Sequence, residues 1–280
     1  MFQTIEECRL AWENAGRHGG TEERIQRNMR WAAYYQHLAN EQSDGDASVD
    51  THAVSIADLL QSEGFLHANA TVLDIGAGMG RYALAFAETG ARVTALDMDA
   101  ASLDVLERQS ARLGLSVQIA HGMWETYAPK RSFSLVFSAM CPAICDYDEL
   151  MKMEALSENA CCLIAVTRGS YDLHRKKLMA LLSAKPSGMT TEAIWYYNML
   201  YVMGRQPDVK NFATHAAYRI SIEDACHRNE IYFQIFGIGA AESRPVLQQY
   251  FKSVAVDGLV YDETHLNTAM ITWKVPRENT

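Results

Sequence analysis

Short apolar runs alternate with helical stretches through the middle of the chain. Between the runs, residues 81–88 and 100–113 have helical spacing and end at Gly90 and Gly114, and Asp146 with Glu149 predicts the capping box of another helix. Strands that are apolar on both faces and alternate with helices indicate a parallel sheet covered by helices on both sides. The predicted strands are 70–75, 92–96, 115–120, 134–139 and 161–167.

The two flanking regions depart from this alternation. We predict that residues 1–66 form an N-terminal helical cap, with helices over 22–38 and 53–63 separated by a polar gap. Residues 67–280 then form the main domain, in which the aromatic-rich segment 171–214 is a helical lid insertion after the fifth strand. Towards the carboxyl end we expect a short strand near 218–220, a helix that starts at Ser221, and an antiparallel strand over 268–275.

Composition and charge restrict the class of protein. The chain has 280 residues, of which 49% are hydrophobic and 21% charged, so it can build a core and is not intrinsically disordered. The net charge of −9 opposes a nucleic-acid partner, because few cations are present to displace counterions from a polyanion. No apolar run reaches the roughly 18 residues that span a membrane, and no signal-like start is visible. We therefore expect a cytoplasmic protein without membrane contact.

The six cysteines suggest neither a disulfide framework nor a metal centre. No CxxC pair occurs, and Cys161 and Cys162 lie inside an apolar run, which is typical of reduced core residues. Cys141 and Cys145 are four residues apart, but Pro142 opposes the helix that would bring both sulfurs to one metal. No metal site is predicted.

The most informative segment is residues 72–80, which read VLDIGAGMG between the first strand and the first helix of the sheet region. Glycines there let backbone amides approach a ligand at the helix N-terminus. Arg81 stands where a dinucleotide fingerprint needs a small residue, and Asp74 would repel a pyrophosphate but favour an ammonium group. Asp97 follows Gly76 by 21 residues, where a carboxylate accepts hydrogen bonds from ribose hydroxyls. A nucleoside with a cationic tail fits these features better than a dinucleotide does.

This segment, followed by VTALD at 93–97, resembles the class I S-adenosylmethionine-dependent methyltransferases, with weaker matches at 122–124 and 137–144. The resemblance covers residues 70–167 well and the remainder only by general layout. It implies an α/β fold of Rossmann-like type, with a doubly wound sheet of seven mostly parallel strands whose last strand is antiparallel. It also implies S-adenosylmethionine as the cofactor and methyl transfer as the activity.

The resemblance further implies roles for individual residues. The methionine part of the cofactor is expected on the loop, the ribose on Asp97, and the adenine between the residues that follow the second and third strands. Met123 departs from the acidic residue that many members carry there, which leaves adenine recognition to other groups. The expected cofactor-binding residues are Asp74, Gly76, Ala77, Gly78, Gly80, Asp97, Met98, Met123 and Trp124.

Several of these residues also allow purely structural interpretations. Asp74 could be a satisfied structural carboxylate, and Trp124 could be packing. Arg81 is either a surface helix residue or a partner of the cofactor carboxylate. Asp99 is expected to cap the following helix. Cys141 follows the fourth strand, where related enzymes place acceptor-contacting residues, but no histidine partner can be assigned that would make it a nucleophile.

We predict a small-molecule acceptor enclosed by the amino-terminal helix (24–39) and by residues 190–212 of the insertion. Tyr197 and Tyr201 lie one helical turn apart in that insertion, and such an aromatic stripe is either core or a cover over the active site. The expected substrate-contacting residues are Tyr35, Tyr197, Asn198 and Tyr201. No catalytic residue is assigned, because the histidines available as a general base, His37, His174 and His215, cannot be ranked.

Two other functions are compatible with a cofactor-binding α/β domain. A nicotinamide-dependent oxidoreductase is disfavoured by Arg81 and Asp74. The second alternative is a non-catalytic subunit that binds S-adenosylmethionine. Cofactor binding without methylation of any acceptor would distinguish it from an enzyme. The acceptor atom and the oligomeric state, including a homodimer, are left open by the sequence.

Overall fold

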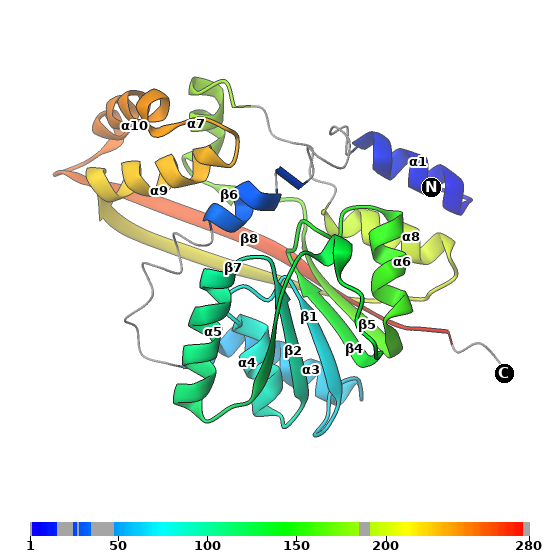
Figure 1. The fold of residues 1–280 in the computed structure, drawn as a ribbon. Coiled ribbons are helices and arrows are strands. Elements are labelled where there is room, and N and C mark those ends of the chain that lie inside the picture. The colour runs from blue at the N-terminus through cyan, green and yellow to red at the C-terminus, as the bar shows by residue number, and fades with distance from the viewer. Residues whose placement is uncertain (1, 16–24, 27, 35–47, 185–190, 277–280) are drawn as a thin grey trace.

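The computed structural model describes residues 2–15, 25–26, 28–34, 48–184 and 191–276. One sheet organises the chain (Figure 1). Its five parallel strands are β1 (Thr71–Ile75), β2 (Arg92–Asp97), β3 (Val117–His121), β4 (Phe133–Ala139) and β5 (Ser157–Val166). The antiparallel strands are β6 (Tyr171–Asp172), β7 (Asp208–Ser221) and β8 (Leu259–Lys274), and the order is β3-β2-β1-β4-β5-β8-β6, with β7 also paired to β8.

The strand order reverses beside β1, and this reversal determines where a ligand crevice can form. The chain runs from β1 outward to β2 and β3, then returns to lay β4 on the other side of β1. Loops that leave the carboxyl ends of β1 and β4 therefore diverge to opposite faces of the sheet. In open α/β sheets this divergence opens the crevice in which ligands bind.

Helices cover both faces of the sheet and make two cores. On one face, α3 (Thr51–Ser62), α4 (Arg81–Glu88) and α5 (Ala100–Leu113) pack around Phe86 and Phe137. On the other face, α1 (Ile5–Ala15), α6 (Tyr147–Ala155) and α8 (Ala193–Val202) pack around Trp12 and Trp273. The predicted caps are confirmed: Asp99, Asp146 and Ser221 each accept a backbone hydrogen bond at the start of a helix.

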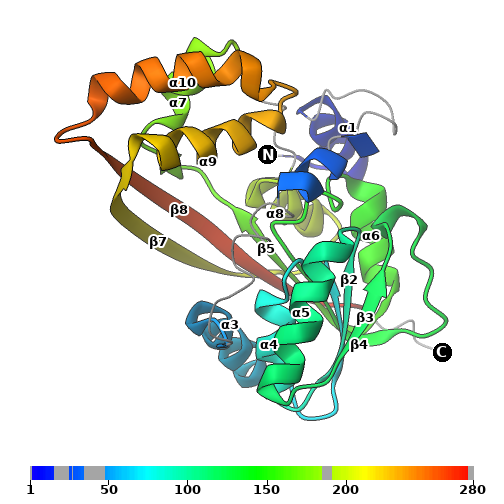
Figure 2. The same cartoon turned by 60° about the vertical axis from the view of Figure 1, so that its left-hand side comes forward.

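The β7–β8 pair is longer than the rest of the sheet and continues past it as a two-stranded ribbon. Its register is unbroken from Asp208↔Thr272 to Ser221↔Leu259. At the far end of the ribbon, α7 (Arg175–Leu181), α9 (Ile222–Gln234) and α10 (Ala240–Val254) gather around Val260 as a third core. Figures 1 and 2 both show these helices grouped away from the main sheet.

The predicted α/β class, with mostly parallel strands and an antiparallel last strand, is confirmed, and within the described residues the sheet has eight strands where seven are predicted. The segment 171–214 is also not uniformly helical: it includes β6, and β7 begins at Asp208, ten residues before the predicted strand. Most of β7 is exposed or half-buried, so its sequence lacks the alternation of buried and exposed positions that marks a strand.

The helices of the N-terminal region pack on different parts of the structure. Ile56 and Leu60 of α3 are fully buried against α4, because α3 carries a single apolar stripe that packs onto that helix. Residues 25–26 and 28–34 of the predicted 22–38 helix are helical in the described chain. The domain boundary at residue 66 stays a prediction. No described helix combines the length and the apolar character needed to cross a membrane.

Candidate active site

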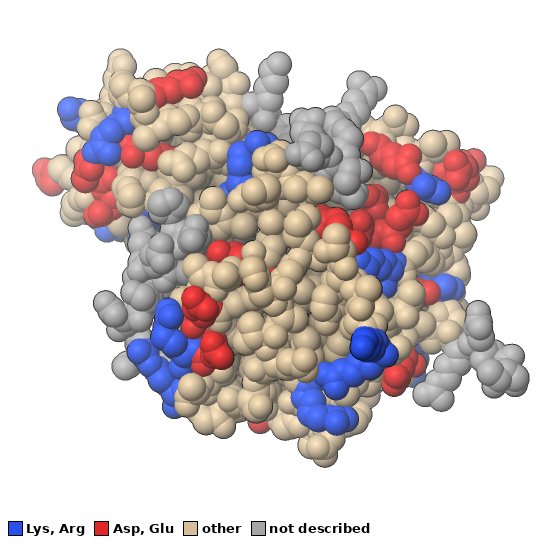
Figure 3. All heavy atoms as spheres, in the orientation of Figure 1, with Lys and Arg blue, Asp and Glu red and all other residues tan. Residues whose placement is uncertain are grey.

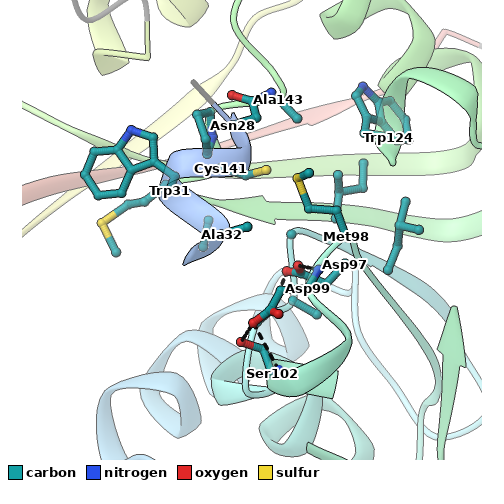
Figure 4. Close-up of a pocket in the computed structure, with 18 of the residues that line it drawn as sticks. Asn28, Trp31, Ala32, Asp97, Met98, Asp99, Ser102, Trp124, Cys141 and Ala143 are labelled. Carbon is teal, nitrogen blue, oxygen red and sulfur yellow. Dashed lines mark hydrogen bonds between the residues drawn. The ribbon is translucent and has the colours of Figure 1, made fainter. Parts of the chain in front are cut away.

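A cavity of about 280 Å³ lies at the carboxyl ends of β1, β2 and β4 (Figure 4). Its wall combines the glycine loop, the ends of β2 and β3, the loop after β4, and the helical segment 28–34. In Figure 4, Asn28, Ala32 and Cys141 lie on the side of the cavity opposite Asp97 and Asp99. Segments from five parts of the sequence thus meet at the crevice that the topology predicts.

The glycine loop is fixed to β2 and open towards the cavity. The amides of Gly76 and Ala77 donate to the Leu96 carbonyl oxygen at 2.8 and 3.0 Å. A Cβ atom on Gly76 would lie 2.5 Å from Cys141 Sγ, so only glycine fits there. A Cβ on Gly78, whose φ is +53°, would meet nothing within 4 Å. The loop is therefore tightly packed at Gly76 and leaves free space for a ligand at Gly78, as a bound nucleoside cofactor requires.

Asp97 lines the cavity beside this loop. Its Oδ2 accepts from the Gly78 amide at 2.8 Å and its Oδ1 accepts from the Asp99 amide at 2.8 Å. Burial raises the pKa of Asp97, while these two backbone hydrogen bonds favour its ionised form. A carboxylate has about four acceptor positions, so Asp97 keeps the capacity to accept from ligand hydroxyl groups.

Asp74 lies behind the loop and does not line the cavity. Its side chain is almost fully buried, and Oδ2 has no hydrogen-bond partner in the structure. Burial, with a contribution from the charge of Asp97, raises the pKa of Asp74 to about 8. The structure does not bring Asp74 to the cavity wall, and its contact with a cofactor ammonium stays a prediction.

The predicted adenine-flanking residues divide into two groups. Met98 and Trp124 line the cavity, whereas Met123, the residue before the short 3-10 helix η1 (Trp124–Thr126), does not. The Trp124 ring is buried, and Lys152 Nζ lies 4.3 Å from its centroid. The indole N–H of Trp124 has no hydrogen-bond partner in the structure, which leaves a buried donor beside the cavity.

The helical segment 28–34 closes one side of the cavity through Asn28, Trp31 and Ala32. Asn28 Nδ2 donates to Glu125 Oε1 at 3.3 Å, and the buried Asn28 Oδ1 has no partner. The segment is attached to α9, since Arg30 Nε donates to the Ile235 carbonyl oxygen at 2.9 Å. Sequence reasoning placed this helix at the site but did not single out Asn28 or Glu125. Tyr35 and His37 lie outside the described residues.

The loop after β4 supplies the other side of the cavity. Met140 adopts φ +50°, an uncommon conformation for a residue with a side chain, and the next three residues also line the cavity. Burial raises the pKa of the Cys141 thiol to about 12, so it is protonated at neutral pH. A protonated thiol is a poor nucleophile, which favours packing as the role of Cys141.

The predicted tyrosines of α8 lie elsewhere. Tyr197 and Tyr201 stack on each other at 6.2 Å between ring centroids on the outer side of α8, where Tyr201 is 55% exposed. The same helix buries Tyr196 and Met199 against the sheet. Tyr197, Asn198 and Tyr201 therefore do not line this cavity, and their contact with a substrate stays a prediction. Because apolar and aromatic residues occur on all sides of α8, its sequence did not indicate which side faces the sheet.

None of the described residues that line the cavity is a histidine. His174 is buried in the third core, where its ring nitrogens lie 2.9 Å from Tyr250 Oη and 2.8 Å from the Tyr261 carbonyl oxygen. His215 lies on the β7–β8 ribbon. Arg81 lines the cavity and also forms an ion pair with Asp50 at 3.1 Å. Neither described histidine is brought to the site, and no general base is assigned.

The chain is similar to known methyltransferases in one part of its sequence and in its fold. Residues 72–160 match a family model described as a methyltransferase domain. A candidate methyltransferase from Bacillus halodurans shares the fold with a TM-score of 0.53 at 19% identity, covering 80% of this chain and all of that one. The magnesium protoporphyrin IX methyltransferase of Synechocystis PCC 6803, solved with bound S-adenosylhomocysteine, aligns with a TM-score of 0.48 at 11% identity over 83% of this chain and 93% of that one. No curated protein sequence gives a significant match.

The match over residues 72–160 identifies a methyltransferase domain in this chain, and the Rossmann-like fold with its glycine loop is that of the class I S-adenosylmethionine-dependent methyltransferases. S-adenosylmethionine is its cofactor. The open space at Gly78, the carboxylate of Asp97 and the free indole N–H of Trp124 are residue features that fit this group.

Proposed function

We propose that the protein methylates a small molecule that enters the cavity opposite the glycine loop. The observation that carries this proposal is the helical segment 28–34, which lies over the cavity and is attached to α9. A cavity closed in this way suits an acceptor of limited size better than a macromolecular chain.

Within this proposal, the chain holds the cofactor along one side of the cavity. The N-terminus of α4, which follows the loop 76–80, faces the methionine part, because a helix N-terminus attracts a carboxylate. Asp97 accepts hydrogen bonds from the ribose, and Met98 with Trp124 flanks the adenine. Asp74 supports the cofactor ammonium from behind the loop. When bound, S-adenosylmethionine supplies an electrophilic methyl group on a sulfonium that is already an activated leaving group.

The remaining work of the protein is to align the acceptor and exclude water. Trp31, Pro142 and Ala143 provide apolar surface for an acceptor skeleton. Asn28 and Glu125 are polar groups on the cavity wall, and the unpaired Asn28 Oδ1 is available to accept a hydrogen bond. A buried acceptor atom without a partner favours a substrate that brings a donor, such as an amine or a hydroxyl group.

Charge supports the choice of a small molecule over a nucleic acid. The net charge is −9, and among the described residues on the face drawn in Figure 3, Lys and Arg occur in small groups interspersed with Asp and Glu. No continuous basic tract crosses that face in the described part of the chain. A polyanionic acceptor would need such a tract to bind.

Turnover on defined acceptors tests the proposal. We would first identify small molecules that copurify with the protein by mass spectrometry, then assay related amines and hydroxyl compounds for the formation of S-adenosylhomocysteine. Methylation of one compound class, and loss of it in Asn28→Ala with cofactor affinity retained, would support the proposal. Methylation of RNA, DNA or protein substrates and of no small molecule would contradict it. Tight cofactor binding without turnover on any acceptor would favour a non-catalytic subunit.

A further inference from the structure

Three residues with metal-binding side chains meet on the β7–β8 ribbon, outside the active-site cavity: His215, Glu263 and His265. His215 pairs directly with His265 in the antiparallel register of the two strands. Glu263 is two residues before His265 on β8, so its side chain points to the same face of the ribbon. The sequence does not indicate this cluster, because His215 and Glu263 are 48 positions apart.

The ligand atoms are already close enough to share one ion. His215 Nε2 lies 3.0 Å from Glu263 Oε1, and His265 Nε2 lies 2.8 Å from the same oxygen. The three ligand atoms all lie within 4.8 Å of one another. Tetrahedral zinc with bonds of about 2.0–2.1 Å separates its ligand atoms by roughly 3.3 Å. The three ligand atoms are therefore close enough for side-chain adjustment to bring them around one zinc ion.

The crowding of polar groups around Glu263 also favours a cation at this point. Its Oε1 faces both histidine nitrogens and also the Tyr171 hydroxyl at 3.0 Å, while Oε2 accepts from the Tyr261 hydroxyl at 3.0 Å. With both Nε2 atoms protonated, three donors would share the two lone pairs of one oxygen. A metal ion at this point lets the imidazole nitrogens bind as neutral ligands. The tyrosine hydroxyls then orient the carboxylate, as residues around metal ligands commonly do.

The backbone fixes this arrangement across three strands. Tyr171 of β6 pairs with His265, and its ring stacks on the imidazole at 4.4 Å between centroids. The neighbouring Asp262 and Val260 are buried and point away from the cluster by strand alternation. The His215 side chain is 51% exposed and that of Glu263 22%, so an ion can reach the site from solvent.

We propose that His215, Glu263 and His265 bind one zinc ion, with the fourth coordination position open to water. Two imidazoles and one carboxylate suit zinc and other late first-row divalent metals, whereas magnesium and calcium prefer oxygen ligands. The ion ties β7 to β8 at the start of the ribbon that carries α7, α9 and α10. It stabilises that ribbon, onto which the active-site segment 28–34 is attached through α9.

Metal titration of the full-length, tag-free protein tests this site. After dialysis against a chelator, zinc is added in calorimetry, and cobalt is added while the visible absorption of tetrahedral Co²⁺ is recorded. We expect one zinc per chain, a higher melting temperature with zinc, and weakening of zinc binding by at least about tenfold in His265→Ala and Glu263→Gln. His67→Ala is the matched control, since His67 is exposed and its Nδ1 contacts only a backbone carbonyl oxygen in the structure.

A further variant guards against misfolding of the ribbon. His215→Asn removes the most exposed ligand, and circular dichroism should match that of the wild type while zinc binding falls. The proposal is overturned if the wild-type protein binds no zinc. It is also overturned if the three ligand variants bind zinc as tightly as His67→Ala does.

Discussion

At the scale of single residues, the carboxylates near the glycine loop have separate tasks. Asp97 contacts two backbone amides and lines the cavity, whereas Asp99 accepts from the amides of Ala101 and Ser102 at the start of α5. Asp74 lies behind both in a buried position. Because the surroundings of the three carboxylates differ, we expect substitution of Asp97 to change cofactor affinity, of Asp99 to change stability, and of Asp74 to change the pH dependence of stability.

Asp97→Ala should weaken S-adenosylmethionine binding by about ten- to a hundredfold. The variant loses charge-assisted hydrogen bonds to the ribose, which contribute roughly 1.5–3 kcal/mol. Calorimetric titration with S-adenosylmethionine measures the effect, and circular dichroism checks that the fold is retained. An unchanged affinity would remove Asp97 from the proposed ribose site.

Asp99→Ala should act mainly on stability. The lost N-cap of α5 costs about 0.5–2 kcal/mol, which lowers the melting temperature by a few degrees. Its affinity for the cofactor should fall less than that of Asp97→Ala. If the two variants showed the opposite pattern, Asp99 would be the ribose ligand.

Asp74 should make the free energy of unfolding depend on pH. Its pKa is about 8 in the folded chain and about 3.9 when unfolded, so between these values the folded state binds more protons. The contribution of Asp74 to stability is therefore complete below about pH 4 and falls, by up to about 1.4 kcal/mol per pH unit, as pH rises towards 8. The free energy of unfolding of Asp74→Asn, which cannot ionise at this position, should not show this fall. In urea unfolding, the variant should therefore compare more favourably with the wild type at pH 8 than at pH 5. Parallel pH profiles would show that Asp74 is ionised when folded.

At the scale of elements, two aromatic helical segments that look alike in sequence have different positions. The segment 28–34 lies over the cavity and packs Trp31 and Tyr34 against Tyr232 of α9. Helix α8 packs on α1 and the sheet, with its tyrosine pair outside. Only the first segment is placed to act as a cover.

Trp31→Ala should reduce turnover at least about tenfold while cofactor affinity changes little, because an opened cover admits water and loosens the acceptor. Tyr201→Ala is the matched control, since this tyrosine is 55% exposed and outside the cavity, and it should keep wild-type turnover. Steady-state kinetics on an identified acceptor makes the comparison. Equal loss in both variants would contradict the assignment of the cover to residues 28–34.

At the scale of the whole molecule, a ligand bound in the crevice should raise the free energy of unfolding. S-adenosylmethionine or S-adenosylhomocysteine at a hundred times its Kd should add about 2.7 kcal/mol and raise the melting temperature by several degrees. NAD should cause no shift, because Arg81 and the spacing of the glycines do not fit a dinucleotide fingerprint. Differential scanning calorimetry with each ligand tests this. A shift with NAD alone would favour the oxidoreductase alternative.

The sequence by itself determined the central part of this protein. Helices 81–88 and 100–113 have the predicted bounds, and Asp99, Asp146 and Ser221 cap helices as expected. These features depend on local interactions, such as side-chain caps and positive-φ glycines, or on strands buried on both faces. The interactions that produce these features lie within a few residues of each other, so the sequence predicts them. The glycine loop 76–80 is another feature that local sequence predicts.

Only the tertiary structure decided the rest. The length of β7 depends on its pairing with β8, since most of β7 is exposed and has no clear hydrophobic pattern. The side of α8 that faces the sheet depends on α1, and the position of Asn28 beside Glu125 depends on contacts 97 residues apart. The His215–Glu263–His265 cluster likewise exists only once two distant strands are in register. Each of these features depends on long-range packing, which no local pattern in the sequence specifies.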